Sequence, residues 1–343
     1  METTKAKTKP AWVDAIKPYQ IPDHRKSIWQ LINSLVPYLL IWVLMYYSLR
    51  VNYLITLALA FVNALFMMRL FIIQHDCGHN SFFNSTKLND LLGGVLGIIS
   101  MTPYHHWRRT HAKHHATAGD LDFRGIGDIY TMTVDEYAAL PWHRKVTYRI
   151  YRNPLVKFVI GPTLLFIVLH RFLLSKDADK RERRSVLYTN IALAAIFAGL
   201  SLWIGWRETL LIWVPIMVLG SSIGVFLFYV QHQFEDTYWR WHEEWDYTEA
   251  ALRGASFFKM NKVAQWFSGN IGFHHVHHLS PKIPNYNLER AHYENEIFHQ
   301  VETITFFTSF KTIFLHLWDE QTHKLISWTE YARMQRQRPA GAA

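Results

Sequence analysis

Cysteine is almost absent from this sequence, and charged residues are scarce. A single thiol, Cys77, cannot form a disulfide, a Cys-built zinc site or a cysteine-ligated iron–sulfur cluster within one chain. Charged residues make up 18% of the 343 positions, whereas soluble domains usually have about a quarter. The chain also has no GxGxxG fingerprint opening a helix and no haem-attachment motif. These absences exclude the common built-in redox centres and direct attention to the apolar runs.

Long apolar runs predict four membrane-spanning helices. A bilayer core of ~30 Å needs about 20 helical residues, and four runs come near that length. We expect spans at about residues 28–49, 51–73, 186–206 and 209–231. Only Arg207 and Glu208 separate the last two runs, which predicts a tight hairpin there.

Two further apolar stretches are too short to span. Residues 91–104 and 158–169 have 14 and 12 positions and contain glycine or proline, which favours interfacial or re-entrant helices. The expected fold class is therefore all-α integral membrane, with four transmembrane helices and interfacial helices. The alternative for all six stretches is a set of buried helices in a large soluble core.

The distribution of basic residues predicts the orientation. The net charge of +9 comes with no basic patch interleaved with aromatics in a nucleic-acid module. Basic residues instead precede the first and third spans, namely Lys5, Lys7, Lys9, Lys17, Arg25, Lys26, Arg171, Lys176, Lys180, Arg181, Arg183 and Arg184. The positive-inside rule then places both termini and residues 75–184 in the cytoplasm. The first apolar run starts too late and is too long for a cleavable signal peptide.

Histidine is the unusual residue, with 20 in the chain and nine in three short clusters. The clusters read HxxxH (75–79), HxxHH (111–115) and HHxHH (274–278), the last containing a further HxxHH. Spacings of three and four residues put side chains on one helix face, so each cluster can supply several ligands to one metal. An even number of crossings also returns all three clusters to the same side of the membrane. The number of ligand-spaced histidines favours two metals over one.

The identity of the metal does not follow from spacing, because imidazole suits zinc, copper, iron and nickel. The membrane location favours iron, since acyl chains offer redox chemistry at C–H bonds and no hydrolysable bond along most of their length. A membrane metal transporter is the alternative from another class. It would carry histidines along a pore within its spans, where this sequence has almost none.

At these residues the sequence resembles the membrane-bound fatty acid desaturase family, and in particular its bacterial acyl-lipid branch of delta-5 and delta-12 type. The resemblance covers about residues 30–320. It includes the segments WRRTHAKHH (107–115), GIGDIYTMTVDEY (125–137), FYVQHQFEDTY (228–238) and GNIGFHHVHHLSPKIPNY (269–286). It implies four spans, a cytosolic histidine-rich cap and a di-iron centre.

The resemblance also implies the ligands and their surroundings. By matching position, the expected metal ligands are His75, His79, His111, His114, His115, His232, His274, His277 and His278. Asp76 and Asp120 are expected either to orient ligand imidazoles, as outer carboxylates do, or to be ordinary solvated loop residues. His275 is expected to touch a ligand or to be structural rather than to bind a metal. No further catalytic residue is expected beyond the ligands. Cys77 is expected to pack in the core.

The expected activity is that of an oxygen-dependent oxidoreductase that introduces a cis double bond into acyl chains of membrane phospholipids. Two iron ions would supply the chemistry, and an external ferredoxin or flavodoxin would supply two electrons per turnover. The expected location is the cell membrane, with the site on the cytoplasmic side. A fatty acyl hydroxylase of the same superfamily is the nearest alternative, and regioselectivity stays open.

The corresponding division of the chain has three parts. Residues 1–27 form a cytoplasmic N-terminal tail, residues 28–320 the membrane desaturase domain, and residues 321–343 a cytoplasmic C-terminal tail.

Overall fold

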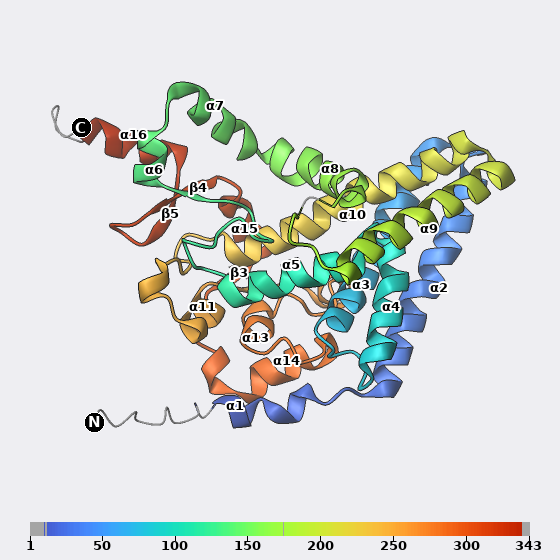
Figure 1. Cartoon of the computed structure of the whole chain (residues 1–343), viewed down its shortest axis with the longest axis horizontal. Coiled ribbons are helices and arrows are strands. Elements are labelled where there is room, and N and C mark those ends of the chain that lie inside the picture. Colours follow the sequence, from blue (N-terminus) through green and yellow to red (C-terminus); the bar gives the residue numbers. More distant parts are fainter. Residues whose placement is uncertain (1–9, 11, 174, 338–343) are drawn as a thin grey trace.

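Four long helices form the frame of the protein (Figure 1). The computed structural model describes residues 10, 12–173 and 175–337. The four helices long and apolar enough to cross a membrane are α2 (His24–Ser48), α3 (Tyr53–Gly78), α9 (Lys180–Ile204) and α10 (Trp206–His232). They coincide with the four predicted spans, and they extend the second span from residue 73 to Gly78.

Local capping explains where these helices begin and turn. Asp23 accepts hydrogen bonds from the backbone N–H groups of Arg25 and Lys26, and Asp179 forms a capping box with Glu182. The predicted hairpin at Arg207 and Glu208 lies elsewhere, because both residues are inside the first turn of α10. The turn is made by Gly205, whose φ of 100° is a conformation that side-chain-bearing residues rarely adopt.

Helix α3 is the centre of the helical frame. Half of its most apolar window is buried, compared with 6% of that of α9. It packs against α2, α10 and α4 (Thr86–Ile99), and its Ala60, Ala64 and Met67 are buried in the core they share. The end of α3 is thereby held among several elements, while α9 lies at the periphery.

The two short apolar stretches do not form straight spans. Residues 91–104 fall mainly in α4, which has 14 residues and is too short to cross a bilayer. Residues 158–169 fall in a π-helical turn (Val156–Ile160), α8 (Gly161–Ile167) and η3 (Leu169–Arg171). Together with α7 (Trp142–Tyr151) they form a helix pair bent by 58°, which fits a re-entrant segment or a broken span.

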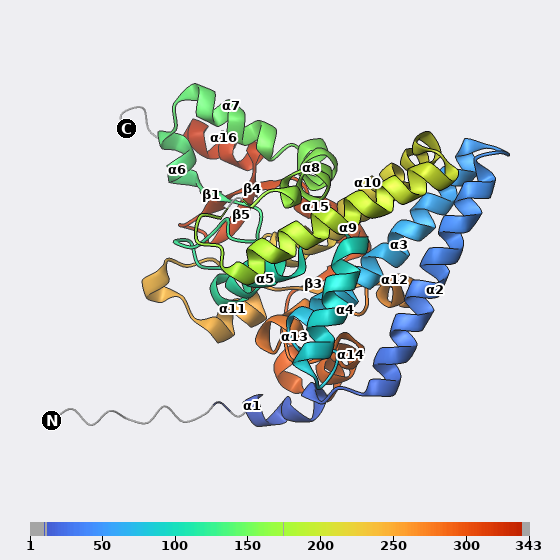
Figure 2. The ribbon, with the colours of Figure 1, turned by 45° about the vertical axis from the view of Figure 1, so that its right-hand side comes forward.

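The remaining elements build a cap over one end of the frame (Figure 2). Its helices include α5 (Tyr104–Thr117), α6 (Val134–Ala139), α11 (Tyr247–Arg253), α12 (Lys262–Phe267), α13 (His274–Leu279), α14 (Asn285–Glu294), α15 (Phe306–Thr312) and α16 (Trp328–Gln337). Short one-turn helices complete it, namely α1 (Trp12–Ala15), η1 (Lys17–Gln20), η4 (His242–Glu244) and η5 (Glu296–Phe298).

The chain is mostly helical with four candidate spans, as the expected fold class requires, and the cap adds a few short strands. Strands β1 (Met132–Thr133), β4 (Leu315–Asp319) and β5 (Lys324–Ser327) form one sheet in the order β1-β4-β5. Strands β2 (Phe257–Lys259) and β3 (Thr303–Thr305) form a parallel pair. Strands of two to five residues have too few positions to show a period-two pattern, so the sequence gives no sign of them.

The predicted tails are largely part of the packed cap. Ile16 and Tyr19 are buried, and the Tyr19 hydroxyl donates to Glu294 over 2.6 Å. Leu325 is buried in β5, which pairs with β4. Residues on the outer sides of the expected boundaries at 27 and 320 thus contact the cap. Lys5, Lys7 and Lys9 lie outside the described residues.

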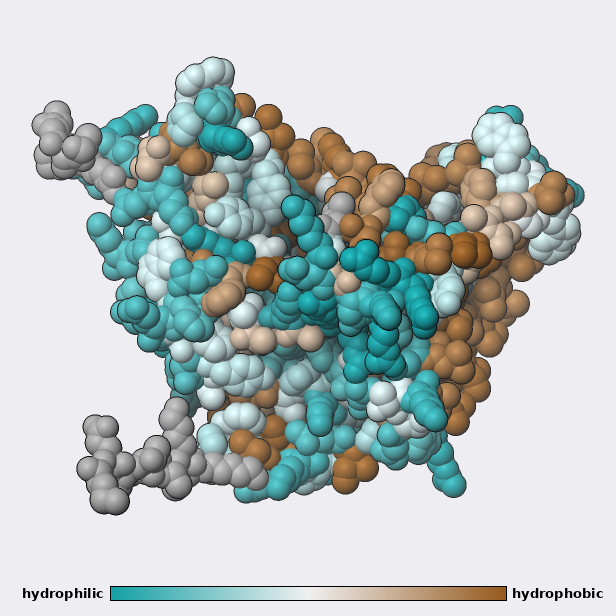
Figure 3. Space-filling view, in the orientation of Figure 1, coloured by the Kyte–Doolittle hydropathy of each residue, from teal (hydrophilic) through white to brown (hydrophobic). Residues whose placement is uncertain are grey.

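Apolar side chains cover the outside of the frame and continue onto two cap helices. Figure 3 shows the hydrophobic surface over α2 and along the edge that contains α8. Helix α15 exposes Phe306, Phe307 and Phe310, and the Phe310 ring lies 6.3 Å from the ring of Phe226 in α10. Helix α7 exposes Trp142, which is 77% accessible. Contiguous exposed aromatic residues beside spans indicate contact with the bilayer surface.

The exposed phenylalanines of α15 give a direct test of this arrangement. The only native cysteine, Cys77, is buried. The cysteine introduced by Phe307→Cys is therefore the only accessible thiol, and a spin label attaches there. We expect this label to collide more with oxygen, which partitions into lipid, than with a water-soluble nickel complex. Ala112→Cys, on the exposed side of α5, is the control and is expected to show the opposite order. Equal accessibility to the nickel complex at both positions would show that α15 does not lie at the membrane surface.

Candidate metal centre

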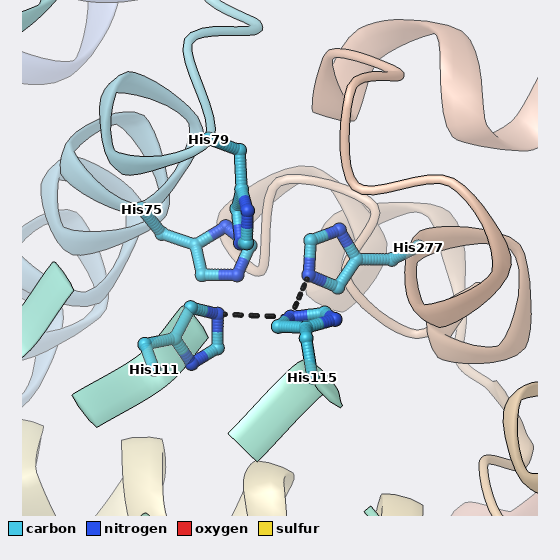
Figure 4. Close-up of side chains that lie close together, drawn as sticks. All are labelled: His75, His79, His111, His115 and His277. Atoms are coloured by element: carbon cyan, nitrogen blue, oxygen red, sulfur yellow. Dashed lines mark hydrogen bonds between the residues drawn. The ribbon is translucent and has the colours of Figure 1, made fainter. Parts of the chain in front are cut away.

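The three histidine clusters meet at one end of the frame, where the cap covers it. The first group contains His75 and His79 from the end of α3, His111 and His115 from α5, and His277 from α13. One ring nitrogen of each lies within 4.8 Å of those of the others. Figure 4 shows the five side chains pointing toward one another from three separate elements.

A second group lies beside the first. His114 from α5, His232 from the end of α10 and His278 from α13 also bring ring nitrogens within 4.8 Å of one another. His274 joins them through His232, since their Nε2 atoms are 2.9 Å apart. The rings of His115 and His278 are stacked at 4.3 Å. All nine predicted ligands are therefore gathered in two adjoining groups.

The contacts between imidazoles cannot all be hydrogen bonds. The Nε2 atom of His115 lies 3.1 Å from that of His111 and 3.0 Å from that of His277. A ring nitrogen has either one proton or one lone pair, so His115 Nε2 can hydrogen-bond to only one of them. His232 Nε2 is in the same position between His114 and His274, at 3.2 and 2.9 Å.

A bound cation would satisfy these nitrogens together. Two nitrogens each about 2.1 Å from one metal are ~3.0 Å apart at a right angle and ~3.4 Å apart at a tetrahedral angle. The four separations of 2.9 to 3.2 Å fit the smaller angle. His79 Nε2 and His278 Nε2 are also buried without a hydrogen-bond partner in the described residues. The donors present therefore fit metal ions held by several imidazoles.

Hydrogen bonds on the far side of two rings fix which nitrogen faces inward. His232 Nδ1 donates to the backbone oxygen of Gly254 over 3.0 Å, which leaves Nε2 as the ligand atom. His75 Nδ1 lies 3.3 Å from Asp76 Oδ1. Asp76 Oδ2 accepts from the backbone and side-chain N–H groups of Asn285 at 2.7 and 2.8 Å. Asp76 thus has the position expected of an orienting carboxylate.

Local backbone features bring the clusters into position. His79 caps the C-terminus of α3, so His75 and His79 lie on one face at i and i+4. Pro103 is the N-cap of α5, which carries the second cluster. Gly127 has a φ of 73°, and a Cβ there would lie 3.2 Å from the Cβ of His114. The GIGD segment can therefore pass close over the second group.

Burial sets the protonation state of the cap histidines. It lowers the pKa of His111, His114 and His115 well below the ordinary imidazole value, and neighbouring histidines lower it further. The pKa values of His277 and His278 are lowered well below that value for the same two reasons. The rings are consequently neutral at neutral pH, which is the form that binds metals.

Asp120 and His275, unlike Asp76, make their hydrogen-bond contacts outside the two histidine groups. Asp120 touches no ligand ring, because its Oδ2 lies 2.7 Å from Nδ1 of His242 and its Oδ1 accepts from the backbone of Asp122. Asp120 follows the end of α5, and its backbone forms an isolated β-bridge with Arg240. This bridge directs Asp120 toward another part of the cap. His275 Nε2 lies 2.9 Å from Nδ1 of His292, on the side of the cluster away from both groups. Its role is packing within the cap.

Two residues beside the histidine clusters, Cys77 and His106, have structural contacts. Cys77 is buried in the core as expected. His106 Nδ1 lies 3.2 Å from Glu182 of α9, which helps to join α5 to that span.

Trp107 is a site residue that the sequence reasoning missed. Its ring stacks on His111 with centroids 4.7 Å apart and an angle of 14° between the planes. It also lies 5.8 Å from the ring of His75. The spacing of four residues between Trp107 and His111 on a helix was the available signal.

Metal content tests the two groups separately. We expect two metal ions per chain after reconstitution with ferrous iron and removal of excess metal, measured by elemental analysis. His111→Ala should lower the content at the first group and His232→Ala at the second, each to about one ion. His275→Ala is the matched control, because it removes a buried imidazole outside both groups, and it should retain two. Retention of both ions in the His111 and His232 variants would refute the grouping.

Acid should destabilise the metal-free chain. The folded-state pKa values of the cap histidines are lowered, so the unfolded chain binds more protons below its own pKa of about 6.5. Stability is therefore expected to be constant above about pH 7 and to fall as the pH decreases through about 6.5. The midpoint of thermal unfolding of chelator-treated protein measures this. A midpoint that rises on acidification would contradict it.

Known proteins match this chain over the region that contains the site. The family model described as fatty acid desaturase matches residues 52–306. A fatty acid desaturase of Bacillus subtilis (strain 168) is 46% identical over 307 residues, which cover 90% of this chain and 87% of the relative. An sn-1 oleoyl-lipid 12-desaturase of Synechocystis sp. is 28% identical over 65% of this chain and 63% of its own length. An sn-1 acyl-lipid omega-3 desaturase (ferredoxin) of the same organism is also 28% identical, over 65% of this chain and 62% of its own length. The chain belongs to the fatty acid desaturase family.

Proposed function

We propose that this protein is an oxygen-dependent acyl-lipid desaturase that forms a cis double bond in the acyl chains of membrane phospholipids. The observation that supports this most directly is the convergence of nine imidazoles in two groups at one end of four membrane-spanning helices. That arrangement suits two iron ions at the depth where lipid acyl chains begin.

The proposed ligand set is the one assigned from the three clusters and α10. His75, His79, His111, His115 and His277 would hold one ion, and His114, His232, His274 and His278 the other. Neutral imidazole suits iron as well as other transition metals. When bound, the iron pair supplies the oxidising chemistry that removes two hydrogens from neighbouring methylene carbons.

The chain's own residues hold and shield this centre. The Gly254 carbonyl and Asp76 orient His232 and His75, and Trp107 fixes the plane of His111. Phe228 packs against both His114 and His232 at about 5 Å, on the wall of a small cavity beside the second group. An apolar wall at this place excludes water and can contact an acyl methylene. Placement is important because a misplacement of about 1 Å can be costly in rate.

The lipid substrate and the orientation form part of the proposal. The spans bring the site to the membrane, and the names of two relatives refer to acyl lipids. The basic residues before α2 and α9 favour a cell-membrane location with the site and both termini in the cytoplasm.

An external electron donor completes the proposal. The sequence has one cysteine and no nucleotide fingerprint, so it lacks a recognisable means of its own to supply electrons. The names of several relatives specify ferredoxin. A ferredoxin or a flavodoxin is therefore the proposed donor.

Lipid analysis of a desaturase-free host tests the function. The wild-type chain should produce new monoenes whose double-bond position is located by mass spectrometry. His114→Ala, His111→Ala and His277→Ala should each reduce product by at least about a hundredfold, because they remove proposed ligands. His275→Ala is the control and should retain measurable product.

Two outcomes would overturn this proposal. Hydroxy fatty acids in place of monoenes would identify a hydroxylase. Equal loss of product in all four variants, with the protein still in the membrane and metal retained, would show that the proposed ligands have no special role.

A further inference from the structure

Helix α5 has two functional sides. Its inner side carries His111, His114 and His115 into the two histidine groups. Its outer side exposes Ala112, Lys113 and Ala116. A helix with its side chains is about 10 Å wide, so a molecule that touches the outer side is about one helix diameter from the proposed ligands.

The start of α9 packs against α5 and makes this outer side strongly basic. Exposed basic residues there are Lys176, Lys180, Arg181, Arg183 and Arg184. Within the described residues, Arg181 lies 3.5 Å from Asp90, whereas Lys113, Lys176, Lys180, Arg183 and Arg184 take part in none of the ion pairs found. We call Lys113 together with these last four residues the basic face. Figure 3 shows a continuous hydrophilic area where α5 and the start of α9 lie in Figure 1.

The nearby carboxylates do not cancel this charge. Glu182 is buried and is paired with Arg109 and His106. Asp90 is paired with Arg108 at 2.7 Å as well as with Arg181. Asp177 and Asp179 are exposed, but Asp179 caps α9. Five basic residues therefore face solvent with two exposed carboxylates among them.

The other approach to the histidine groups has the opposite charge. The cavity beside His114 and His232 is bordered by Tyr238 and Trp239. The chain around this border exposes several carboxylates, namely Asp122, Glu235, Asp236, Glu243 and Glu244, and in the described part of the chain Lys324 pairs with Glu235 and Asp236 but with none of the other three. An acidic partner would be repelled there and attracted to the basic face.

Trp107 lies on the inner side of α5, beside the first group. It is half-buried, stacks on His111 at 4.7 Å and contacts Phe71 of α3 with ring centroids 5.4 Å apart. The path from the basic face to a proposed ligand is therefore the width of α5 itself. Such a short path is needed because electron transfer slows steeply with distance.

We propose that the basic face is the docking surface for a small acidic one-electron carrier of the ferredoxin class. This inference rests on the proposed desaturase function. Per turnover, two reduced carriers would each give one electron. With these two electrons, two protons and the two hydrogens of the substrate, one oxygen molecule becomes two waters and the methylene pair becomes an alkene.

Anionic lipid headgroups are the alternative occupant, since α9 enters the apolar layer soon after Arg184. Lys113 argues against this, because it lies on α5, which is not a span. Short alanines on either side of Lys113 also leave room for a protein to approach the helix closely.

The test measures binding of an oxidised plant-type [2Fe–2S] ferredoxin to the full chain in phosphatidylcholine nanodiscs at low salt. Lys113→Glu combined with Lys180→Glu is expected to weaken binding by about tenfold or more, because rim charges control steering and its salt dependence. Arg333→Glu combined with Arg336→Glu is the matched control. It makes the same change of charge on exposed residues of α16, away from α5 in Figure 1, and should change binding less than about twofold.

A charge-preserving variant separates charge from shape. Lys113→Arg combined with Lys180→Arg should bind as the wild type does. Equal weakening by the two glutamate pairs, weakening by the arginine pair, or no binding of the wild-type chain would overturn the docking surface.

The binding test and the desaturase function can fail separately, because ferredoxin binding needs no turnover. Product formation driven by reduced methyl viologen reports on the desaturase function alone, and it should be the same in the wild type and in every charge variant. Normal ferredoxin binding with no product from either donor would refute the function and leave the docking surface standing.

Discussion

The convergence of nine imidazoles on two adjoining points, where all but the half-buried His79 and His111 are buried, is the constraint on which the rest of this structure depends. A buried polar nitrogen without a partner costs free energy, and a buried imidazolium beside others would cost more. Nitrogens such as His115 Nε2 and His232 Nε2 have two neighbours but capacity for one hydrogen bond. A shared cation would resolve that conflict, and its binding would then be coupled to the packing of the cap.

The membrane helices give this centre a rigid frame. Helices α3 and α10 end in the centre itself, at His75, His79 and His232. Next to His232, the side-chain oxygen of Gln233 accepts from the fully buried Arg152, which also donates to the backbone oxygens of Tyr130 and Leu315. This buried guanidinium has only neutral acceptors in the described structure, and it joins three cap segments to the end of α10. A ligand on a span is thus fixed from both its membrane side and its cap side.

The proposed ligands and the proposed docking surface lie on opposite sides of one helix, α5. Helix α5 presents ligands inward, where Trp107 stacks on His111, and basic residues outward. Elsewhere on the surface, α7 and α15 expose aromatic residues that suit a bilayer surface. The arrangement gives the substrate and the proposed electron carrier separate approaches to one buried centre.

Local spacing in the sequence determined a large part of this protein. Runs of apolar residues specify the four spans, and spacings of three and four specify which histidines share a helix face, because both depend on a few consecutive residues. Matching to the family's motifs added His232, which has no cluster of its own.

Only the tertiary structure decided how these local units combine. It placed His115 in one group and His114 in the other, brought His274 to His232, and sent Asp120 to His242 while Asp76 faces His75. It also moved the hairpin to Gly205 and packed residues 12–20 and 324–337 into the cap. These outcomes depend on contacts between residues up to about 275 positions apart. Such distances are fixed by the packing of whole elements, about which no local pattern carries information.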